Sequence, residues 1–406
     1  MSKALERLKM SLKQGEKVQL GIGPMSVHCV DAVIEMANAA RHPIMLVASR
    51  RQIEAASKGG GYVNNWTTRT FAQYVRERDK GGYVVLCRDH GGPWQNTTEI
   101  NKNLSIDEAM ASAKESFSID IESGFDVIHL DPSIDIHQEA LSQHDVLKRL
   151  FELWKHCIEV SKEFGADIAF EVGTEEQSGT NQGIKSFEQL LEAVTRFSGE
   201  QNIDKPLFVV GQTGTLTKET YNVGTFGKFA NRIERISTEM EISKILNICR
   251  QYGIHLKAHN VDYLSNKDLT RFLNLGVHSA NIAPELGVLQ TCHILQVCRE
   301  FGLNRESDKL LELAYNSGKW KKWMLPSTNA TDFAKATIAG HYVFSTEEFQ
   351  EIMSNIRLQC GTKGLDIDSS IRESIKLKIA SFMYSFNLFS NLEWTPEYAT
   401  RSLVAA

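Results

Sequence analysis

The sequence lacks the features that mark secreted and membrane-inserted proteins. It has no uninterrupted run of about 18 apolar residues, so no membrane span is expected. Its first segment, MSKALERLKMSLKQGEK, is charged and amphipathic and has no apolar stretch of the signal-peptide kind. The seven cysteines are scattered and show no CxxC spacing, which is typical of reduced thiols. We therefore expect a cytoplasmic protein without membrane contact.

Charge of one sign is also scarce. The net charge is -5 and no long run of acidic or basic residues occurs, which argues against a nucleic-acid partner. With 42% hydrophobic and 23% charged residues, the chain of 406 residues has the composition of an ordinary globular protein with a large core.

Short apolar runs alternate with helix-like stretches along the first part of the chain. In 28–41 and 145–165, for example, apolar residues recur at spacings of three and four, as in helices that pack one face on a sheet. This alternation indicates a parallel sheet. The eight apolar runs are 17–23, 43–49, 83–90, 126–132, 167–173, 206–212, 254–260 and 277–284.

Eight such units predict a (β/α)8 TIM barrel, an α/β fold. The alternative, a doubly wound open sheet, usually carries a glycine-rich phosphate turn after its first strand, where this chain reads GIGPMS. We predict a barrel over residues 1–290 and a helical C-terminal extension over 291–406 that packs on it. Within the extension, 344–359 reads as a helix with Ser345 as its N-cap, and the apolar segment 380–394 should dock on the barrel or on a partner subunit.

Polar residues gather at the carboxyl ends of six of the eight runs. Barrel enzymes build their active sites at this end of the strands. Because alternate residues of a strand share a face, Lys257 and His259 should both point to the barrel axis, as should His129 and Asp131. The polar endings are Asp89-His90, His129-Leu130-Asp131, Glu171, Gln212, Lys257-Ala258-His259-Asn260 and Asn281.

Five motifs at these strand ends, in this order, resemble a known family. They are DH, HLD, VGTE, QxG and AHxxDY, and segments 26–37 and 59–75 fit the same pattern. The chain resembles, over roughly residues 10–355, the tagatose-bisphosphate aldolase non-catalytic subunit family. Those proteins assist or resemble class II ketose-bisphosphate aldolases, and some relatives are sugar-phosphate or hexuronate 4-epimerases.

The resemblance implies a divalent metal, with zinc expected, at the end of the barrel strands. It implies Asp89 as the acid/base residue, with His90 and His259 as metal ligands. Gln212 stands where related aldolases carry another histidine ligand, so Glu171 or Glu175 could supply the missing one. The predicted roles are catalytic for Asp89 and Glu175, metal-binding for His90, His259, Glu171 and Gln212, and substrate-binding for His28, Asp131, Lys257, Asn260 and Asn281.

Two departures from the family leave phosphorylation of the substrate open. The stretch AHNVDYLS lacks a glycine-rich phosphate loop, and 334–344 lacks the family's arginine, for which Lys321, Lys322 or Lys335 could substitute only as point charges. Each site residue also has a structural alternative. The histidines could be hydrogen-bonded core residues, and Glu171 could simply neutralise Lys257.

The predicted function is aldol-type chemistry on a ketose or ketose phosphate, by a metal-dependent aldolase or 4-epimerase. The alternative is a non-catalytic accessory subunit that stabilises a separate class II aldolase chain. Schiff-base chemistry through Lys257 is a third possibility. In each case the expected small-molecule partner is a sugar or sugar phosphate, and we expect a homo-oligomer.

Overall fold

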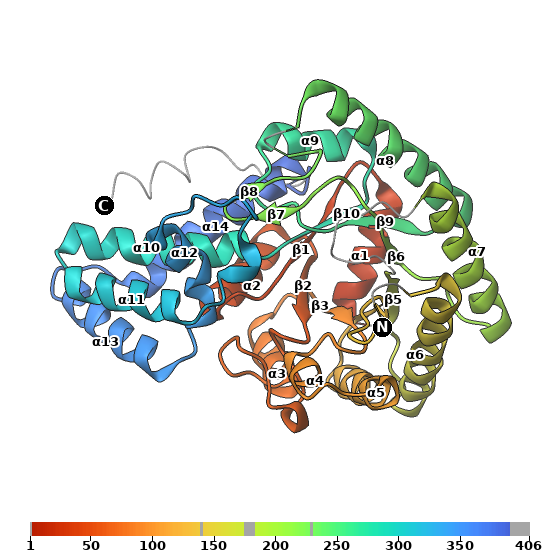
Figure 1. Cartoon of the computed structure of the whole chain (residues 1–406), viewed down its shortest axis with the longest axis horizontal. Coiled ribbons are helices and arrows are strands. Elements are labelled where there is room, and N and C mark those ends of the chain that lie inside the picture. Colours follow the sequence, from red (N-terminus) through yellow and green to blue (C-terminus); the bar gives the residue numbers. More distant parts are fainter. Residues whose placement is uncertain (1, 139–140, 174–182, 228–229, 390–406) are drawn as a thin grey trace.

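Eight parallel strands close into a barrel in the computed structural model, which describes residues 2–138, 141–173, 183–227 and 230–389 (Figure 1). The order around the barrel is β1-β10-β9-β6-β5-β4-β3-β2. All eight predicted strands are present, which confirms the TIM-barrel fold. They are β1 (Gln19–Ile22), β2 (Ile44–Ser49), β3 (Val84–Gly91), β4 (Val127–Leu130), β5 (Ala169–Val172), β6 (Phe208–Val210), β9 (His255–Ala258) and β10 (Ser279–Ile282).

The interior of the barrel is apolar near its amino-terminal end and polar near its carboxyl end. Side chains of the apolar part pack on the helix α1 (Lys3–Gln14), which closes this end of the barrel with Leu5, Leu8 and Leu12. The strand residues in this cluster are Met45, Val47, Val85, Cys87, Val127, Ala169 and Phe208. The polar residues at the carboxyl ends of the strands therefore lie at the opposite, open end of the barrel.

A ring of helices covers the outside of the barrel, and local sequence sets where several of them begin. Ser26 caps α2, Ser105 with Glu108 forms a capping box for α5, and Asn231 with Glu234 does so for α8. The helices are α2 (Val27–Ala40), α3 (Thr68–Arg78), α4 (Thr97–Asn101), α5 (Ile106–Glu122), α6 (Gln143–Glu163), α7 (Ile184–Gln201), α8 (Arg232–Tyr252) and α9 (Asn266–Leu275). A small antiparallel hairpin, β7 (Thr217–Lys218) and β8 (Tyr221–Asn222), lies between β6 and α8.

The C-terminal region is helical, as predicted, and gathers to the left of the barrel in Figure 1. It comprises α10 (Pro284–Phe301), α11 (Asn304–Asn316), α12 (Asp332–Ala339), α13 (Glu347–Gly361) and α14 (Ile367–Ser385). The boundary that we set at residue 290 falls inside α10. The last helix of the described residues, α14, packs between α2 and α9, so it occupies the place of the eighth outer helix. Phe382 and Phe386 are buried there, and the Phe386 carbonyl accepts a hydrogen bond from the Val18 amide at 3.2 Å.

The predicted cap of the helix at 344–359 is wrong by one residue. Thr346 caps α13 by accepting from the Phe349 amide at 3.2 Å. Ser345 instead accepts from the Asn64 amide at 2.6 Å and donates to the Tyr62 carbonyl at 2.7 Å. It therefore joins the extension to the loop after β2.

None of the helices in the described part of the chain is both long enough and apolar enough to cross a membrane.

Candidate functional site

Two adjacent residues at the end of β3, Asp89 and His90, both reach the mouth of the barrel. Neighbours in a regular strand point to opposite faces. Here the pairing of β3 with β4 shifts register between Arg88 and Gly91, and His90 has a φ of 43°, in the left-handed region. This bulge turns both side chains to one side. Asp89 Oδ1 lies 3.7 Å from His129 Nδ1, and His90 Nε2 lies 3.2 Å from His259 Nδ1.

Four side chains from four strand ends converge on one small volume. The potential ligand atoms of Asp89, His129, Glu171 and His259 all lie within 4.8 Å of one another. Glu171 Oε1 is 3.3 Å from His259 Nε2 and 3.5 Å from His129 Nδ1. Two imidazoles and two carboxylates form the kind of donor set that zinc and similar divalent ions bind. The structure thus contains a possible metal-ligand group, and it adds His129, which we had not predicted as a ligand.

Two buried polar atoms of this group have unused bonding capacity. In the described part of the chain, Asp89 Oδ1 and His129 Nε2 are buried without a hydrogen-bond partner. Buried polar atoms are nearly always bonded, and the exceptions concentrate at sites that bind an ion or ligand. The residues present therefore fit a bound cation.

A second set of contacts orients His90. Its Nδ1 lies 2.6 Å from Asp131 Oδ2, which also accepts from Gln95 Nε2 at 3.0 Å. The other Asp131 oxygen accepts from the Ser133 hydroxyl at 2.5 Å. A carboxylate that holds a histidine ring in this way is common behind metal ligands. Asp131 therefore positions His90 in the structure, and its role in substrate binding stays a prediction.

Electrostatics keep both carboxylates of the four-residue group ionised. Burial alone would raise the pKa of Glu171, but the charges of Lys257 and His129 and the bond to His259 bring it down to about 2. Burial also opposes ionisation of Asp89, and the nearby His90 and His129 outweigh it, so its pKa is lowered. Burial lowers the pKa of His259, which leaves its imidazole neutral with a lone pair to offer.

Lys257 forms a tight, buried ion pair with Glu171. The two charged atoms, Nζ and Oε2, are 2.6 Å apart, and each side chain is only 1% exposed. Burial acts to lower the pKa of Lys257, but Glu171 raises it above its ordinary value. A Schiff base needs a neutral amine, so this pairing counts against Lys257 as a nucleophile. It also means that Glu171 both neutralises Lys257 and faces the histidines.

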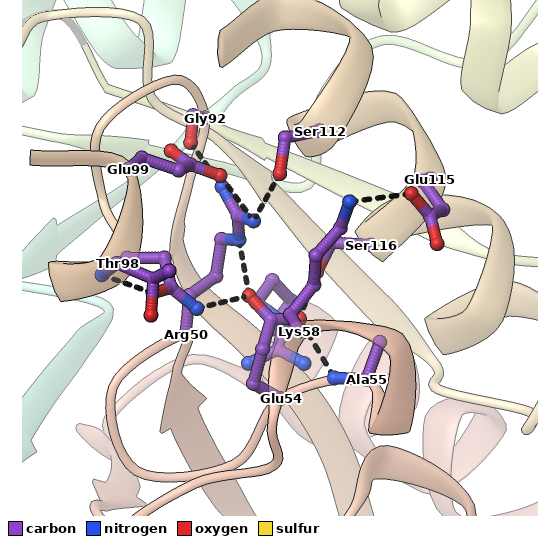
Figure 2. A network of polar contacts seen from close by, with 12 residues as sticks. Arg50, Glu54, Ala55, Lys58, Gly92, Thr98, Glu99, Ser112, Glu115 and Ser116 are labelled. Carbon is purple, nitrogen blue, oxygen red and sulfur yellow. Dashed lines mark hydrogen bonds and ion pairs between the residues drawn. The ribbon is translucent and has the colours of Figure 1, made fainter. Parts of the chain in front are cut away.

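The loop after β3 is held by a buried network that the sequence motifs did not indicate (Figure 2). Arg50, which follows β2, is 2.7 Å from both Glu54 and Glu99 and donates to the Gly92 carbonyl at 2.8 Å. Gly92 and Glu99 flank Gln95, whose amide bonds Asp131. Arg50 therefore fixes the segment that supports the His90–Asp131 pair. The i,i+4 spacing of Arg50 and Glu54 is the one local signal of this network.

The remaining predicted residues have different surroundings. Asn281 is buried next to Gly21, and in the described part of the chain neither atom of its amide has a hydrogen-bond partner. Asn260 is exposed, and Gln212 follows β6 with a partly buried side chain. His28 lies on α2, where its ring contacts Asp368 at 2.8 Å and Gln290 at 3.3 Å, so the structure does not bring it to the group. Glu175 lies outside the described residues.

Comparison with known proteins identifies the fold. A scan against protein-family models finds no match. A probable tagatose 6-phosphate kinase from Sinorhizobium meliloti 1021 has a similar structure, with a TM-score of 0.73 and 14% identity over 91% of this chain and 100% of that one. Fructose-bisphosphate aldolase from Campylobacter jejuni matches with a TM-score of 0.51 and 14% identity over 94% of this chain and 93% of that one. At such identities the likeness shows the barrel fold alone.

Proposed function

We propose that this chain is an enzyme that performs metal-assisted aldol-type chemistry on a ketose or a ketose derivative, as an aldolase or a 4-epimerase. The observation that carries the proposal is the convergence of Asp89, His129, Glu171 and His259 within 4.8 Å at the barrel mouth. The mouth of a barrel is where such enzymes work. The aldolase-like fold and the resemblance of the strand-end motifs support the same function.

In this proposal His259, His129 and Glu171 hold a divalent metal, with zinc the expected ion. His90, whose Nε2 lies 3.2 Å from His259 Nδ1, keeps its predicted role as a further ligand. When bound, the metal would supply Lewis-acid stabilisation of the negative charge that develops on oxygen as the carbon–carbon bond breaks. Lys257 keeps Glu171 ionised and fixed, through the 2.6 Å ion pair. Asp131 orients His90 through the 2.6 Å contact.

Proton transfer falls to Asp89. Its carboxylate is ionised, and its Oδ1 has no hydrogen-bond partner in the part of the chain that the structure describes. It can therefore accept the proton of the C4 hydroxyl as the C3–C4 bond breaks, and return it when the bond forms again. A 4-epimerase would rotate the aldehyde between these steps. An aldolase would release it, and the proton taken up would then go to C3 of the remaining enediolate to complete the ketone product. The amide of Asn281, also without a partner in that part, can hydrogen-bond a sugar hydroxyl.

Metal analysis and turnover test this proposal together. Purified protein should contain about one divalent ion per chain by mass spectrometry, and should cleave or epimerise one member of a panel of ketoses, ketose phosphates and hexuronates. His259→Ala and Glu171→Gln should lose both the metal and the activity. His293→Ala, on the outer helix α10 where the ring contacts Ser370 at 2.8 Å, is the matched control and should keep both.

The products separate the two reactions, because only an aldolase releases a three-carbon fragment. A protein that binds no metal at this group would contradict the proposal. If such a protein instead raised the stability of a separate class II aldolase chain, the accessory role predicted as the alternative would hold. The seven cysteines are unpaired, which fits the cytoplasmic setting that we propose. Homo-oligomer formation stays a prediction.

A further inference from the structure

A hollow of about 720 Å³ lies at the amino-terminal end of the barrel, opposite the candidate metal group. Its wall is made by the C-terminal half of α1, the last turns of α6 and the loops that precede β5, β6 and β9. Volumes of roughly 300–1,000 Å³ are typical of sites that enclose a small organic molecule. Barrel enzymes carry their catalytic groups at the other end of the strands, so this hollow lies outside the proposed active site.

Apolar side chains form the floor of the hollow. Ile158 and Phe170 are buried, and Leu207 is partly buried where it packs on the cluster that α1 closes. His255, the first residue of β9, adds a polar group to the wall, and its ring stands edge-on to that of His278 with centres 4.7 Å apart. Burial lowers the pKa of His255, so its imidazole is neutral at neutral pH and can hydrogen-bond a ligand.

The charged residues of the wall give the opening an excess of positive charge. Four lysines stand against two aspartates, although the whole chain carries a net charge of -5. Three of the lysines are exposed, which places their charges at the opening, and Lys9 is half-buried. An apolar floor below a positive rim is complementary to a molecule with an apolar body and an anionic end. The charged residues are Lys9, Lys13, Lys162, Lys205, Asp167 and Asp204.

We propose that this hollow is a second ligand-binding site of the protein, which takes an organic anion with an apolar ring or chain. The apolar body lies on Ile158, Phe170 and Leu207, and the anionic group meets the lysines. A ligand held there contacts both α1 and the loops before three strands, so its binding should stabilise the docking of α1 on the barrel. The inference is independent of the proposed function, because it uses none of the residues at the barrel mouth.

Titration calorimetry on the full chain tests the site with naphthalenesulfonate, an aromatic ring system that carries one anionic group. We expect one binding site per chain, and a Tm that rises with the concentration of this probe. Methanesulfonate lacks the rings and naphthalenemethanol lacks the charge. Each should bind at least about 10-fold more weakly than naphthalenesulfonate, because each uses only one part of the wall.

Variants test the rim and the floor separately. The triple variant Lys9→Gln, Lys13→Gln, Lys162→Gln removes three charges that should each contribute about 2- to 5-fold, so binding should weaken about 10-fold or more. Ser161→Trp should abolish binding, since Ser161 is a half-buried residue of the wall and the larger side chain fills the hollow without changing its charge. Lys155→Gln is the matched control, because Lys155 is exposed two turns before Lys162 on α6 and does not line the hollow.

A further variant separates the hollow from the barrel mouth. His259→Ala should bind naphthalenesulfonate as the wild type does, whatever its effect on metal binding. The proposal is overturned if the wild type does not bind the probe, if the triple variant binds it as well as Lys155→Gln does, or if His259→Ala loses it. The triple variant changes only exposed or half-buried side chains, so it tests the proposal even if Ser161→Trp fails to fold.

Discussion

Replacement of Arg50 by methionine should destabilise the protein strongly, because it leaves two buried carboxylates without their cationic partner. The Arg50 and Glu54 side chains are 0% exposed and that of Glu99 is 4% exposed, and both carboxylates are 2.7 Å from the guanidinium. Loss of one partner of a buried ion pair costs about 3–5 kcal/mol. Glu54 would keep its bonds to the Ser116 hydroxyl and the Ala55 amide, which favours the lower part of this range.

The expected change in Tm follows from chain length. An unfolding entropy of about 2.1 cal/mol/K per residue, applied to all 406 residues, gives about 0.85 kcal/mol/K. A loss of about 3–5 kcal/mol then lowers the Tm of Arg50→Met by about 4–6 °C. Differential scanning calorimetry would measure this shift.

The loss of stability in Arg50→Met should be larger at neutral pH than at acidic pH. Burial would raise the pKa of Glu54, but Arg50 and Arg88 lower it below its ordinary value. A carboxyl with a lowered pKa in the folded state adds stability above its ordinary pKa, and this stability is lost as the pH falls. The penalty of Arg50→Met should therefore be full at neutral pH and shrink towards pH of about 4.

Two further variants test whether unpaired buried charge causes the loss of stability. Arg50→Met combined with Glu54→Gln and Glu99→Gln should recover much of the lost Tm, since no buried charge is then unpaired. Arg69→Met removes an ion pair with Glu122 in which Arg69 is 61% exposed, and should change stability by no more than about 1 kcal/mol. Calorimetry could find the Tm of Arg50→Met within about 1 °C of the wild-type Tm, which is about a quarter of the predicted shift or less. The network would then not hold the loop.

Three other predictions concern the site and its surroundings. Gly173→Ala should lower metal affinity in a metal titration while the fold persists, because the new Cβ would lie 2.5 Å from His129 Nε2. Gly199→Ala is the control, since a Cβ added there meets no atom within 4 Å. Burial and Glu285 raise the pKa of Asp262 to about 7, so its ionisation costs stability as the pH rises from about 4 to 7. Asp262→Asn should therefore gain Tm relative to the wild type between pH of about 5 and 8, and a difference independent of pH would contradict this. Asn281→Ala should raise KM for the sugar and leave metal content unchanged, and steady-state kinetics with an unaltered KM would remove Asn281 from substrate binding.

Strand positions and the polar rim could be predicted from the sequence because both depend on local patterns. Apolar runs of regular length gave all eight barrel strands. The period of two placed Lys257 inside the barrel, where it meets Glu171. The same alternation would place Asp89 and His90 on opposite faces of the strand, and only the family resemblance predicted that both belong to the site. The bulge that reconciles them depends on how β3 pairs with β4, which no local pattern reports.

Contacts between distant segments were beyond prediction from local pattern. His129 was recognised as facing inward, but its closeness to Glu171 depends on the register of β4 with β5. His28 looked available for substrate because its partner, Asp368, lies 340 residues away. Ser345 has the sequence features of a cap, yet its hydroxyl bonds the loop after β2. In each case a tertiary contact sets the position of the side chain.

The place of α14 between α2 and α9 has a consequence for how the chain folds. As the ribosome releases the protein, β1 and α2 emerge early. The helix that completes their packing, α14, is synthesised only after all eight strands and most of the extension. Until then the apolar face of α2 that α14 covers is open to water and to other chains. Contacts so distant in sequence form slowly, so nascent molecules should depend on chaperones until α14 docks.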